Sequence, residues 1–541
     1  MLVTKQLFDP LYYPYPSKRM VTVSRNGMVA SSQALASQVG LDILKKGGNA
    51  VDAAIATAAA LTVLEPISNG IGGDAFALVW MKDELYGING SGPAPKSISI
   101  DAVKSKGHSK MPVHGWIPVT VPGAPATWAA LSERFGRLDL TTVLQPAIDY
   151  AEKGFPLSPV LASIWGKTYK ENEQALTEEM YQKWFATFGM GGRAPQVGEL
   201  WKSPNHAKTL REIAATKAES FYRGSLADKM VEFSSAHGGF LQKEDLKSYY
   251  PEWVQPISVT YKGHEVWEIP PNGQGLIALM GLNILNGFSL KEKESVDTYH
   301  KQIEAMKLAF TDGKEYITDS RDMSQSVEAL LSDAYAEERR KLIQQEAMQP
   351  SPGQPPLGGT VYLATADGEG NMVSFIQSNY MGFGSGLVVP GTGIALQNRG
   401  HTFSLEEGHN NALKGGKKTY HTIIPGFLTK DDKAVGPFGV MGGFMQPQGH
   451  LQVVSNLVDF HLNPQAALDA PRWRWLKDKK IIVEPHFSSA IAEALERRGH
   501  EVAIHLDVED FGRGQIIVRD PDTGTLYGGT ESRTDSTIAA Y

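Results

Sequence analysis

Hydrophobic residues recur at helical spacing through most of residues 31–343. In residues 31–44, Leu35, Val39 and Ile43 share one face, and two lysines followed by two glycines are typical of a helix C-terminus. Asn49 then precedes an alanine-rich helix at 50–64, which we expect to be packed closely on several sides. Further helices are predicted at 124–135, 143–153, 207–215, 225–236 and 298–310, and extended segments at 75–80, 119–123 and 257–269.

Beyond residue 359 the pattern changes to short strands separated by glycine-rich turns. In the first of them Val361, Leu363 and Thr365 face away from Tyr362, Ala364 and Ala366, as alternate residues of a strand do. Strands flanked by helices on both sides predict one α/β sandwich and not two separate modules. The strands are predicted at 361–366, 372–376, 393–398, 421–428 and 435–440, followed by helices at 465–470 and 488–498 and by closing strands.

The segment between these two parts carries the candidate chemistry. Residues 344–359 are rich in Gln, Pro and Gly and predict an exposed linker, where a chain can be cut without disturbing a core. If the cut falls between Gly359 and Thr360, Thr360 gains a free amine with a pKa of about 8, which can act as base towards its own hydroxyl. Its Oγ would make the cut by an N-to-O acyl shift. Taken alone, Gly-Gly-Thr also fits a plain loop entering a hairpin.

Composition excludes several classes of function. The 541 residues exceed one ordinary core, which predicts either two domains or one large layered domain. A net charge of −7 offers no basic field, so we expect no nucleic-acid partner. With no cysteine, disulfides and thiol chemistry are excluded. The first 25 residues lack the apolar segment of a secretory signal, and the most apolar run, 50–64, is too short for a bilayer. We expect no membrane association and a cytoplasmic protein.

Three further patterns are interpreted as structural. The glycine spacing at residues 70–75 matches the dinucleotide-binding fingerprint. That motif requires a strand, then the loop, then a helix, whereas here the predicted order is helix, loop, strand. We therefore expect no cofactor. Helix 298–310 carries His300, Glu304 and Lys307 on one face, where a solvated or salt-bridged face is commoner than a site. No metal site is expected, because the spacing of the C-terminal histidines fits no ligand pattern: His401, His409, His421 and His450.

Several blocks of sequence stand out along nearly the whole chain: residues 47–56, 66–74, 121–123, 304–310, 442–443 and 470–472, with the segment that begins at Thr360. Together and in this order they resemble the gamma-glutamyltransferase (glutathione hydrolase) family. The resemblance implies an N-terminal-nucleophile hydrolase fold, which is an α/β (α+β) four-layer αββα sandwich. It also implies a proenzyme that cuts itself before Thr360 into a large subunit, 1–359, and a small subunit, 360–541. The two would stay together as one intertwined heterodimer, with further dimerisation left open.

The resemblance assigns roles to individual positions. Thr360 is similar to the family's nucleophile, and Ser378 falls where the family has a second hydroxyl residue that supports it. Gly442 and Gly443 match the glycine pair whose N–H groups form the oxyanion hole, a role for which close backbone approach is needed. Thr422 matches one of a pair of small hydroxyl residues near the substrate.

Other positions depart from the family's pattern for binding the glutamyl amino and carboxylate groups. The region that normally supplies an Arg, residues 89–95, contains none. Tyr380 stands at the position of an Asn, Thr402 at that of an acidic residue, and His421 at that of the first small hydroxyl residue. Small neutral residues do not replace a bidentate Arg–carboxylate contact. Arg399 is a candidate to reach the substrate from a different side.

Three interpretations follow. The first is a self-processing threonine hydrolase or acyltransferase for γ-glutamyl amides such as glutathione. The second keeps the mechanism but takes a glutaryl or other acyl amide, because such departures resemble a divergent intracellular branch of the family that sits close to acylases. The third is an unprocessed, non-catalytic relative that acts as a binding protein. The intact set of Thr360, Ser378, Gly442 and Gly443 argues against the third.

Overall fold

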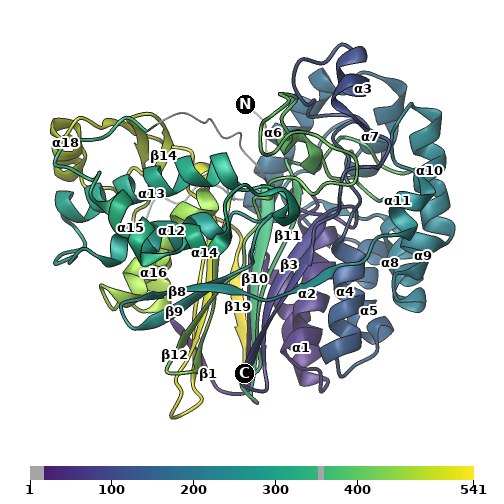
Figure 1. Cartoon of the computed structure of the whole chain (residues 1–541). Coiled ribbons are helices and arrows are strands. Elements are labelled where there is room, and N and C mark those ends of the chain that lie inside the picture. Colours follow the sequence, from purple (N-terminus) through teal and green to yellow (C-terminus); the bar gives the residue numbers. More distant parts are fainter. Residues whose placement is uncertain (1–17, 351–358) are drawn as a thin grey trace, which may run out of the picture.

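Two seven-stranded antiparallel sheets lie face to face at the centre of the molecule, and helices cover the outer face of each (Figure 1). The computed structural model describes residues 18–350 and 359–541. The layer order is therefore helices, sheet, sheet, helices, and the α/β class predicted from the sequence is confirmed. Both of these large sheets mix strands from before and after residue 359, so each of them needs both parts of the chain.

The first sheet holds the strand that begins at the predicted cleavage site. Its strands, in spatial order, are β19 (Thr537–Ala540), β2 (Gly27–Ser31), β10 (Gly359–Asp367), β11 (Met372–Tyr380), β3 (Asp74–Met81), β4 (Glu84–Gly90) and β7 (Glu252–Val254). The second sheet consists of β1 (Thr22–Ser24), β18 (Leu526–Thr530), β17 (Arg513–Arg519), β13 (Lys433–Met441), β12 (Gly426–Lys430), β9 (His264–Glu268) and β8 (Ile257–Tyr261).

Strand β10 is buried on both faces. Tyr362, Ala364 and Ala366 belong to the core between the two sheets, whereas Val361 and Leu363 pack into the core beneath the helices. This is the alternation that the sequence predicts for 361–366, and it places even-numbered residues of β10 on the side of the second sheet. A strand buried in this way has its register fixed, because a shift by one residue would exchange its two faces.

Helices form the outer layers on both sides of the paired sheets. Over the first sheet lie α1 (Ala34–Lys45) and α2 (Ala50–Leu64), with α5 (Leu140–Lys153) packed against α2. Over the second lie α12 (Gly275–Asn286) and α16 (Met445–Val458), with α13 (Val296–Tyr316) packed against α12. The remaining helices are α3 (Ile100–Ser105), α4 (Ala124–Phe135), α6 (Pro159–Ala175), α7 (Gln182–Phe188), α8 (Pro204–Thr216), α9 (Glu219–Arg223), α10 (Ser225–Ala236), α11 (Lys243–Lys247), α14 (Val327–Leu330), α15 (Asp333–Arg340), α17 (Pro464–Asp469) and α18 (Ser489–Arg497). A small sheet joins β14 (Trp473–Lys477), β15 (Lys480–Val483) and β16 (Glu501–Ile504), and β5 (Phe155–Pro156) pairs with β6 (Leu200–Trp201).

Helix α2 is the best example of sequence determining local structure. Every one of its residues is buried, as its alanine-rich sequence predicts, because small side chains let neighbours approach on all sides. Asn49 and Asp52 form a capping box that satisfies backbone N–H groups at the helix start. Asp52 also accepts hydrogen bonds from the N–H groups of Arg137 and Leu138, which ties α2 to the chain that follows α4.

Two strand predictions are wrong in whole or in part. Residues 393–398 form a loop that makes only isolated bridges to residues 72 and 388, and β12 begins at Gly426, five residues later than predicted from the pattern at 421–428. Both segments are buried, so hydrophobicity alone could not separate a core-lining loop from a strand. The predicted linker 344–359 has no helix or strand at 344–350, and residues 351–358 lie outside the described residues.

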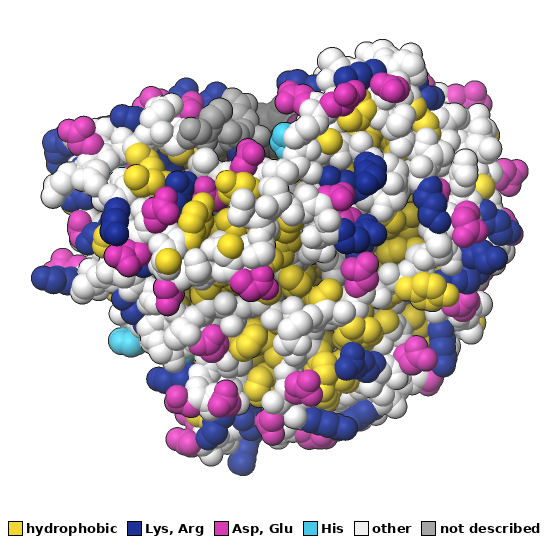
Figure 2. Space-filling model, in the orientation of Figure 1, with side chains coloured by type: hydrophobic (Ala, Val, Ile, Leu, Met, Phe, Trp, Pro, Cys, Tyr) yellow, Lys and Arg dark blue, Asp and Glu magenta, His cyan; other side chains and the backbone are white. Residues whose placement is uncertain are grey.

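On the face of the molecule drawn in Figure 2, basic and acidic side chains are interspersed, without a large field of either sign. This agrees with the modest negative net charge of the chain. None of the helices in the two described ranges is long and apolar enough to cross a bilayer.

The contact between the sheets gives a first prediction. A Cβ on Gly439 of β13 would clash with the ring of Tyr362 on β10, so Gly439→Ala should destabilise the protein by about 1–3 kcal/mol. Gly166 of α6 has open space around its Cα, so Gly166→Ala is a matched control that should stabilise slightly, by up to about 1 kcal/mol. Calorimetric unfolding measures both. Equal unfolding temperatures for the two variants would contradict the face-to-face packing.

Candidate active site

Thr360 lies at an irregularity in the pairing of β10 with β11. Gly359 pairs with Tyr380 and Val361 with Gln377, so Thr360 alone opposes two residues, Ser378 and Asn379. Bulges of this kind change the direction in which a side chain points, and they are common beside active sites. The hydroxyl of Thr360 donates a hydrogen bond to the Oγ of Ser378 over 3.1 Å, and both side chains are buried.

The hydroxyl of Ser378 is held from a second side. Its Oγ accepts a hydrogen bond of 2.8 Å from the backbone N–H of Tyr380. Two donors therefore converge on one oxygen, which fixes the position of the Thr360 hydroxyl and makes the O–H group of Ser378 a better donor of its own proton. The two hydroxyl residues that the sequence analysis paired are brought together as expected.

The glycine pair forms the turn between β13 and α16. Gly442 has φ 134° and Gly443 φ 56°, values that strongly favour glycine. Within the described part of the chain neither amide N–H donates a hydrogen bond, and α16 begins two residues later with its positive end towards the turn. The side-chain amide of Gln274 donates to the carbonyls of both Thr422 (2.6 Å) and Gly443 (2.8 Å), which ties this turn to the segment bearing Thr422.

Arg399 is buried behind Tyr380. Its guanidinium lies 4.4 Å from the centre of the Tyr380 ring and donates a 2.7 Å hydrogen bond to the hydroxyl of Thr422. Burial lowers the pKa of Arg399 to about 10, partly offset by Asp74, so the group is charged at neutral pH. Tyr380 itself has φ 77°, a strained conformation for a bulky residue, and such strain persists only where the surroundings impose it.

Asp74 and His421 form a second buried pair beside Arg399. The Nδ1 of His421 accepts from the N–H of Ile423, so its Nε2 carries the proton and donates to Asp74 over 3.0 Å. Burial, and then the charge of Arg399, lowers the pKa of His421 well below its usual value, so the ring is neutral. Burial raises the pKa of Asp74 to about 7, against the opposing effect of Arg399. His421 therefore orients Asp74, and Asp74 balances Arg399.

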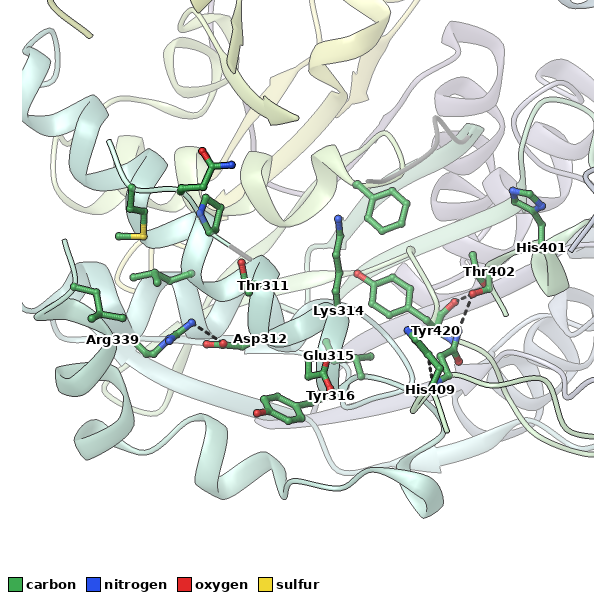
Figure 3. A pocket seen from close by; sticks show the side chains of 18 of the residues that line it. Thr311, Asp312, Lys314, Glu315, Tyr316, Arg339, His401, Thr402, His409 and Tyr420 are labelled. Carbon is green, nitrogen blue, oxygen red and sulfur yellow. Dashed lines mark hydrogen bonds and ion pairs between the residues drawn. The ribbon is translucent and has the colours of Figure 1, made fainter. Parts of the chain in front are cut away.

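A cavity of about 1040 Å³ opens between α13 and the loops that carry these residues (Figure 3). Of the predicted substrate-binding residues, Tyr380 and Thr402 line it, whereas Arg399, His421 and Thr422 lie buried behind. The hydroxyl of Thr402 is bonded to the carbonyl of Arg399 at 2.8 Å, so it supports the wall as well as lining it. Further lining residues include Leu308, Lys314, His401, His409, Tyr420 and Phe444.

Three residues of this assembly were not singled out from the sequence. Asp74 follows two glycines at the start of a buried strand, and a carboxylate at such a position is a usable signal of function. Gln274 follows a Pro-Pro-Asn-Gly turn, and nothing in that context indicates that it bridges two distant carbonyls. Lys314 belongs to the polar pattern of α13, where a lysine is ordinarily a solvated residue.

The face of α13 that carries His300, Glu304 and Lys307 is buried and not solvated. Glu304 and Lys307 form an ion pair of 2.7 Å, and His300 and His500 share a hydrogen bond of 2.9 Å. Nitrogen and oxygen atoms of His300, Glu304 and His500 lie within 4.8 Å of one another, close enough to be considered for a metal ion. The ammonium of Lys307 already supplies the positive charge beside Glu304, so the cluster is balanced without one.

Comparison with known proteins agrees with this geometry. The family model for gamma-glutamyltranspeptidase matches residues 36–541. The crystal structure of a cephalosporin acylase from Bacillus halodurans is 64% identical, with a TM-score of 0.97 and 99% of each chain covered. A glutathione hydrolase-like YwrD proenzyme from Bacillus subtilis is 36% identical, covering 94% of this chain and 97% of that protein. An oxamate amidohydrolase proenzyme from Klebsiella pneumoniae is 33% identical, covering 96% and 99%.

These matches extend over nearly the whole chain and over the paired sheets that hold Thr360. They confirm the resemblance found in the sequence motifs. The chain belongs to the gamma-glutamyltranspeptidase family of hydrolases.

Proposed function

We propose that this protein is a self-processing hydrolase that cleaves glutaryl or similar acyl amides with Thr360 as nucleophile. The observation that carries the proposal is the buried hydroxyl of Thr360, 3.1 Å from the Oγ of Ser378 at the first residues of a central strand. The helix–sheet–sheet–helix layering supports the four-layer αββα fold of an N-terminal-nucleophile hydrolase.

Self-processing starts with attack of the Thr360 Oγ on the carbonyl carbon of Gly359. The peptide nitrogen leaves as the free amine of Thr360, and water then hydrolyses the resulting ester. The products are the large subunit, 1–359, and the small subunit, 360–541. They would remain a heterodimer because β10 lies between β2 of the large subunit and β11 of the small one, so separation would break the first sheet.

Turnover uses the same atoms on an external amide. The free amine of Thr360 takes the proton from its hydroxyl, and the Oγ attacks the substrate carbonyl. The N–H groups of Gly442 and Gly443 stabilise the negative oxygen that forms, a contribution worth about 10²–10³ in rate for one donor. The amine half leaves with the proton, and water then releases the acid from the acyl-Thr360 ester.

The acyl pocket favours an acyl group without an α-amino group. The positive charge of Arg399 would repel an ammonium in this pocket. Thr402 stands where the family has an acidic residue, so it offers no carboxylate to stabilise that ammonium. Tyr380 covers the guanidinium of Arg399 from the cavity side. The high identity with a cephalosporin acylase supports the same choice.

Hydrolysis of γ-glutamyl amides such as glutathione is the second candidate. Arg399 and Thr422 lie together behind Tyr380 and would meet a glutamyl carboxylate if the tyrosine ring moved. The name of the relative from Bacillus subtilis supports this candidate. A non-catalytic binding protein is the least supported, because the nucleophile, its hydroxyl partner and the glycine turn are all present.

The role of Thr360 is tested by two variants that differ in one group. Thr360→Ala removes the nucleophile, so the purified protein should remain one uncut chain without hydrolase activity. Thr360→Ser keeps a hydroxyl, so it should still divide into residues 1–359 and 360–541. Denaturing electrophoresis with intact mass measurement detects the products. Cleavage of the Thr360→Ala variant before residue 360 would disprove the assignment.

The acyl preference is tested with two chromogenic amides that differ only in the α-amino group. Glutaryl-4-nitroanilide should be hydrolysed with a kcat/KM at least about tenfold above that of γ-glutamyl-4-nitroanilide, because like charges in a desolvated pocket are unfavourable.

The paired variant Tyr380→Asn with Thr402→Asp restores the family's amide and carboxylate. Asn also tolerates the positive φ of position 380, so the backbone can be kept. This variant should reduce or reverse the preference for the glutaryl substrate. A tenfold preference of the unmodified enzyme for the γ-glutamyl substrate would instead favour the second candidate.

A further inference from the structure

Residues 344–350, here called the tail segment, are held by contacts with α13 and with the turn that follows α18. The Nε2 of His300 donates a hydrogen bond of 2.8 Å to the carbonyl of Gln344. The N–H of Ala347 donates one of 2.6 Å to the carbonyl of Arg498. The tail segment itself contains no helix or strand, so other elements supply the partners of these backbone groups.

A buried ion pair on α13 binds both polar backbone groups of Met348. The carboxylate of Glu304 accepts a 3.0 Å hydrogen bond from the N–H of Met348, and the ammonium of Lys307 donates one of 3.3 Å to its carbonyl. Both charged side chains are fully buried and lie 2.7 Å apart. Because burial of an ion pair costs desolvation energy that an apolar pair would avoid, such charges are expected where they bind something. Here they bind the main chain of the tail segment.

Two neutral histidines complete the cluster. Burial lowers the pKa of both His300 and His500, so neither ring is charged. The Nε2 of His300 carries its proton towards Gln344, and its Nδ1 therefore accepts the 2.9 Å hydrogen bond from the Nε2 of His500. The four side chains that join α13 and the end of α18 around the tail segment are here called the tail anchor: His300, Glu304, Lys307 and His500.

The tail segment also forms part of the wall of the substrate cavity. Its last residues, 348–350, line the cavity. Leu308 and Thr311, which follow Lys307 on α13, line the same cavity (Figure 3). Helix α13 therefore binds the tail segment and continues the cavity wall beside it.

We propose that the tail anchor is a binding site for residues 344–348, and that it keeps the end of the large subunit in the wall of the substrate cavity after self-cleavage. The proposal rests on the self-processing proposed above, which makes residue 359 a chain end. The residues near a chain end lose their order unless they are tied down. Because the contacts of the tail anchor end at Met348, a cut after residue 359 leaves all of them intact.

A paired variant removes the ion pair and keeps the helix. Glu304→Leu together with Lys307→Met replaces two buried charges by apolar side chains of similar volume, a change that is often neutral for stability. Leu and Met both favour helix. The N–H and carbonyl of Met348 lose their partners, so the tail segment should leave the tail anchor for solvent, where water satisfies both groups. Lys301→Met is the control, because Lys301 lies on the same helix and pairs with Asp297.

Hydrogen exchange followed by mass spectrometry measures the release. In the processed, unmodified protein the amides of Ala347 and Met348 should exchange at least about tenfold more slowly than in a free chain. In the paired variant they should exchange as in a free chain, while β10 keeps its protection. A Glu-specific protease should also cut after the exposed Glu346 at least about tenfold faster in the paired variant. Lys301→Met should behave as the unmodified protein does.

Either of two results would overturn the binding site. The first is free-chain exchange of Ala347 and Met348 in the unmodified protein. The second is a paired variant that keeps both the slow exchange and the resistance to the protease.

Kinetics test the part that the tail segment has in the cavity wall. With glutaryl-4-nitroanilide, the paired variant should raise KM about 3- to 10-fold and leave kcat within about twofold. Thr360 and Ser378 keep their own contacts on β10 and β11, whereas the cavity loses residues 348–350 from its wall. An unchanged KM in a variant whose tail segment is released would contradict this part of the proposal.

The outcomes separate this proposal from the proposed function. If the unmodified protein neither cuts itself nor hydrolyses the amide, the proposed function fails. Hydrogen exchange of the uncut Thr360→Ala protein still decides the binding site, because its contacts do not depend on the cut. Slow exchange of Ala347 and Met348 that is lost on adding the paired substitutions would support the tail anchor, and free-chain exchange without them would overturn it.

Discussion

The pairing of β10 with β11 around Thr360 is the constraint on which the rest of the structure depends. Thr360 and Ser378 are buried in the middle of the first sheet, and both faces of β10 are covered, by the second sheet and by helices. A nucleophile in such a position cannot be moved by local loop motion. Because β2 and β11, the two neighbours of β10, come from opposite sides of the predicted cut, both parts of the chain are needed to bury the strand that carries Thr360.

Buried charge is the second organising feature. Arg399 carries a full positive charge inside the protein, and this charge is stabilised by Asp74, the Tyr380 ring and the Thr422 hydroxyl. The neutral His421 holds Asp74 in place. A buried charge with incomplete partners is costly, so an arrangement of this kind is expected where the charge serves a ligand. It also supports our proposal that an acyl group without an ammonium suits the pocket.

Much of the fold could be predicted from the sequence, because its signals are local. Capping at Asn49, the alternation along β10 and the Gly359–Thr360 junction depend only on neighbouring residues, and the structure has each of the first two as expected. The site was predicted in part: Thr360 and Ser378 meet, whereas Arg399, a candidate to reach the substrate, lies buried behind Tyr380 beside Thr422. The contacts of Asp74 and Gln274 join residues more than 140 positions apart in the sequence. A pattern of neighbouring residues cannot indicate such contacts. The loop at 393–398 was wrongly predicted to be a strand because it is buried, and a buried loop can have the same apolar composition as a buried strand.

The central claim is that Thr360 carries the acyl group during turnover. Acid quenching of the enzyme during hydrolysis of glutaryl-4-nitroanilide, followed by peptide mass mapping, tests it directly. The account predicts the mass of one glutaryl group on the peptide that begins with Thr360. The same mass on a different residue, with Thr360 unmodified, would contradict it.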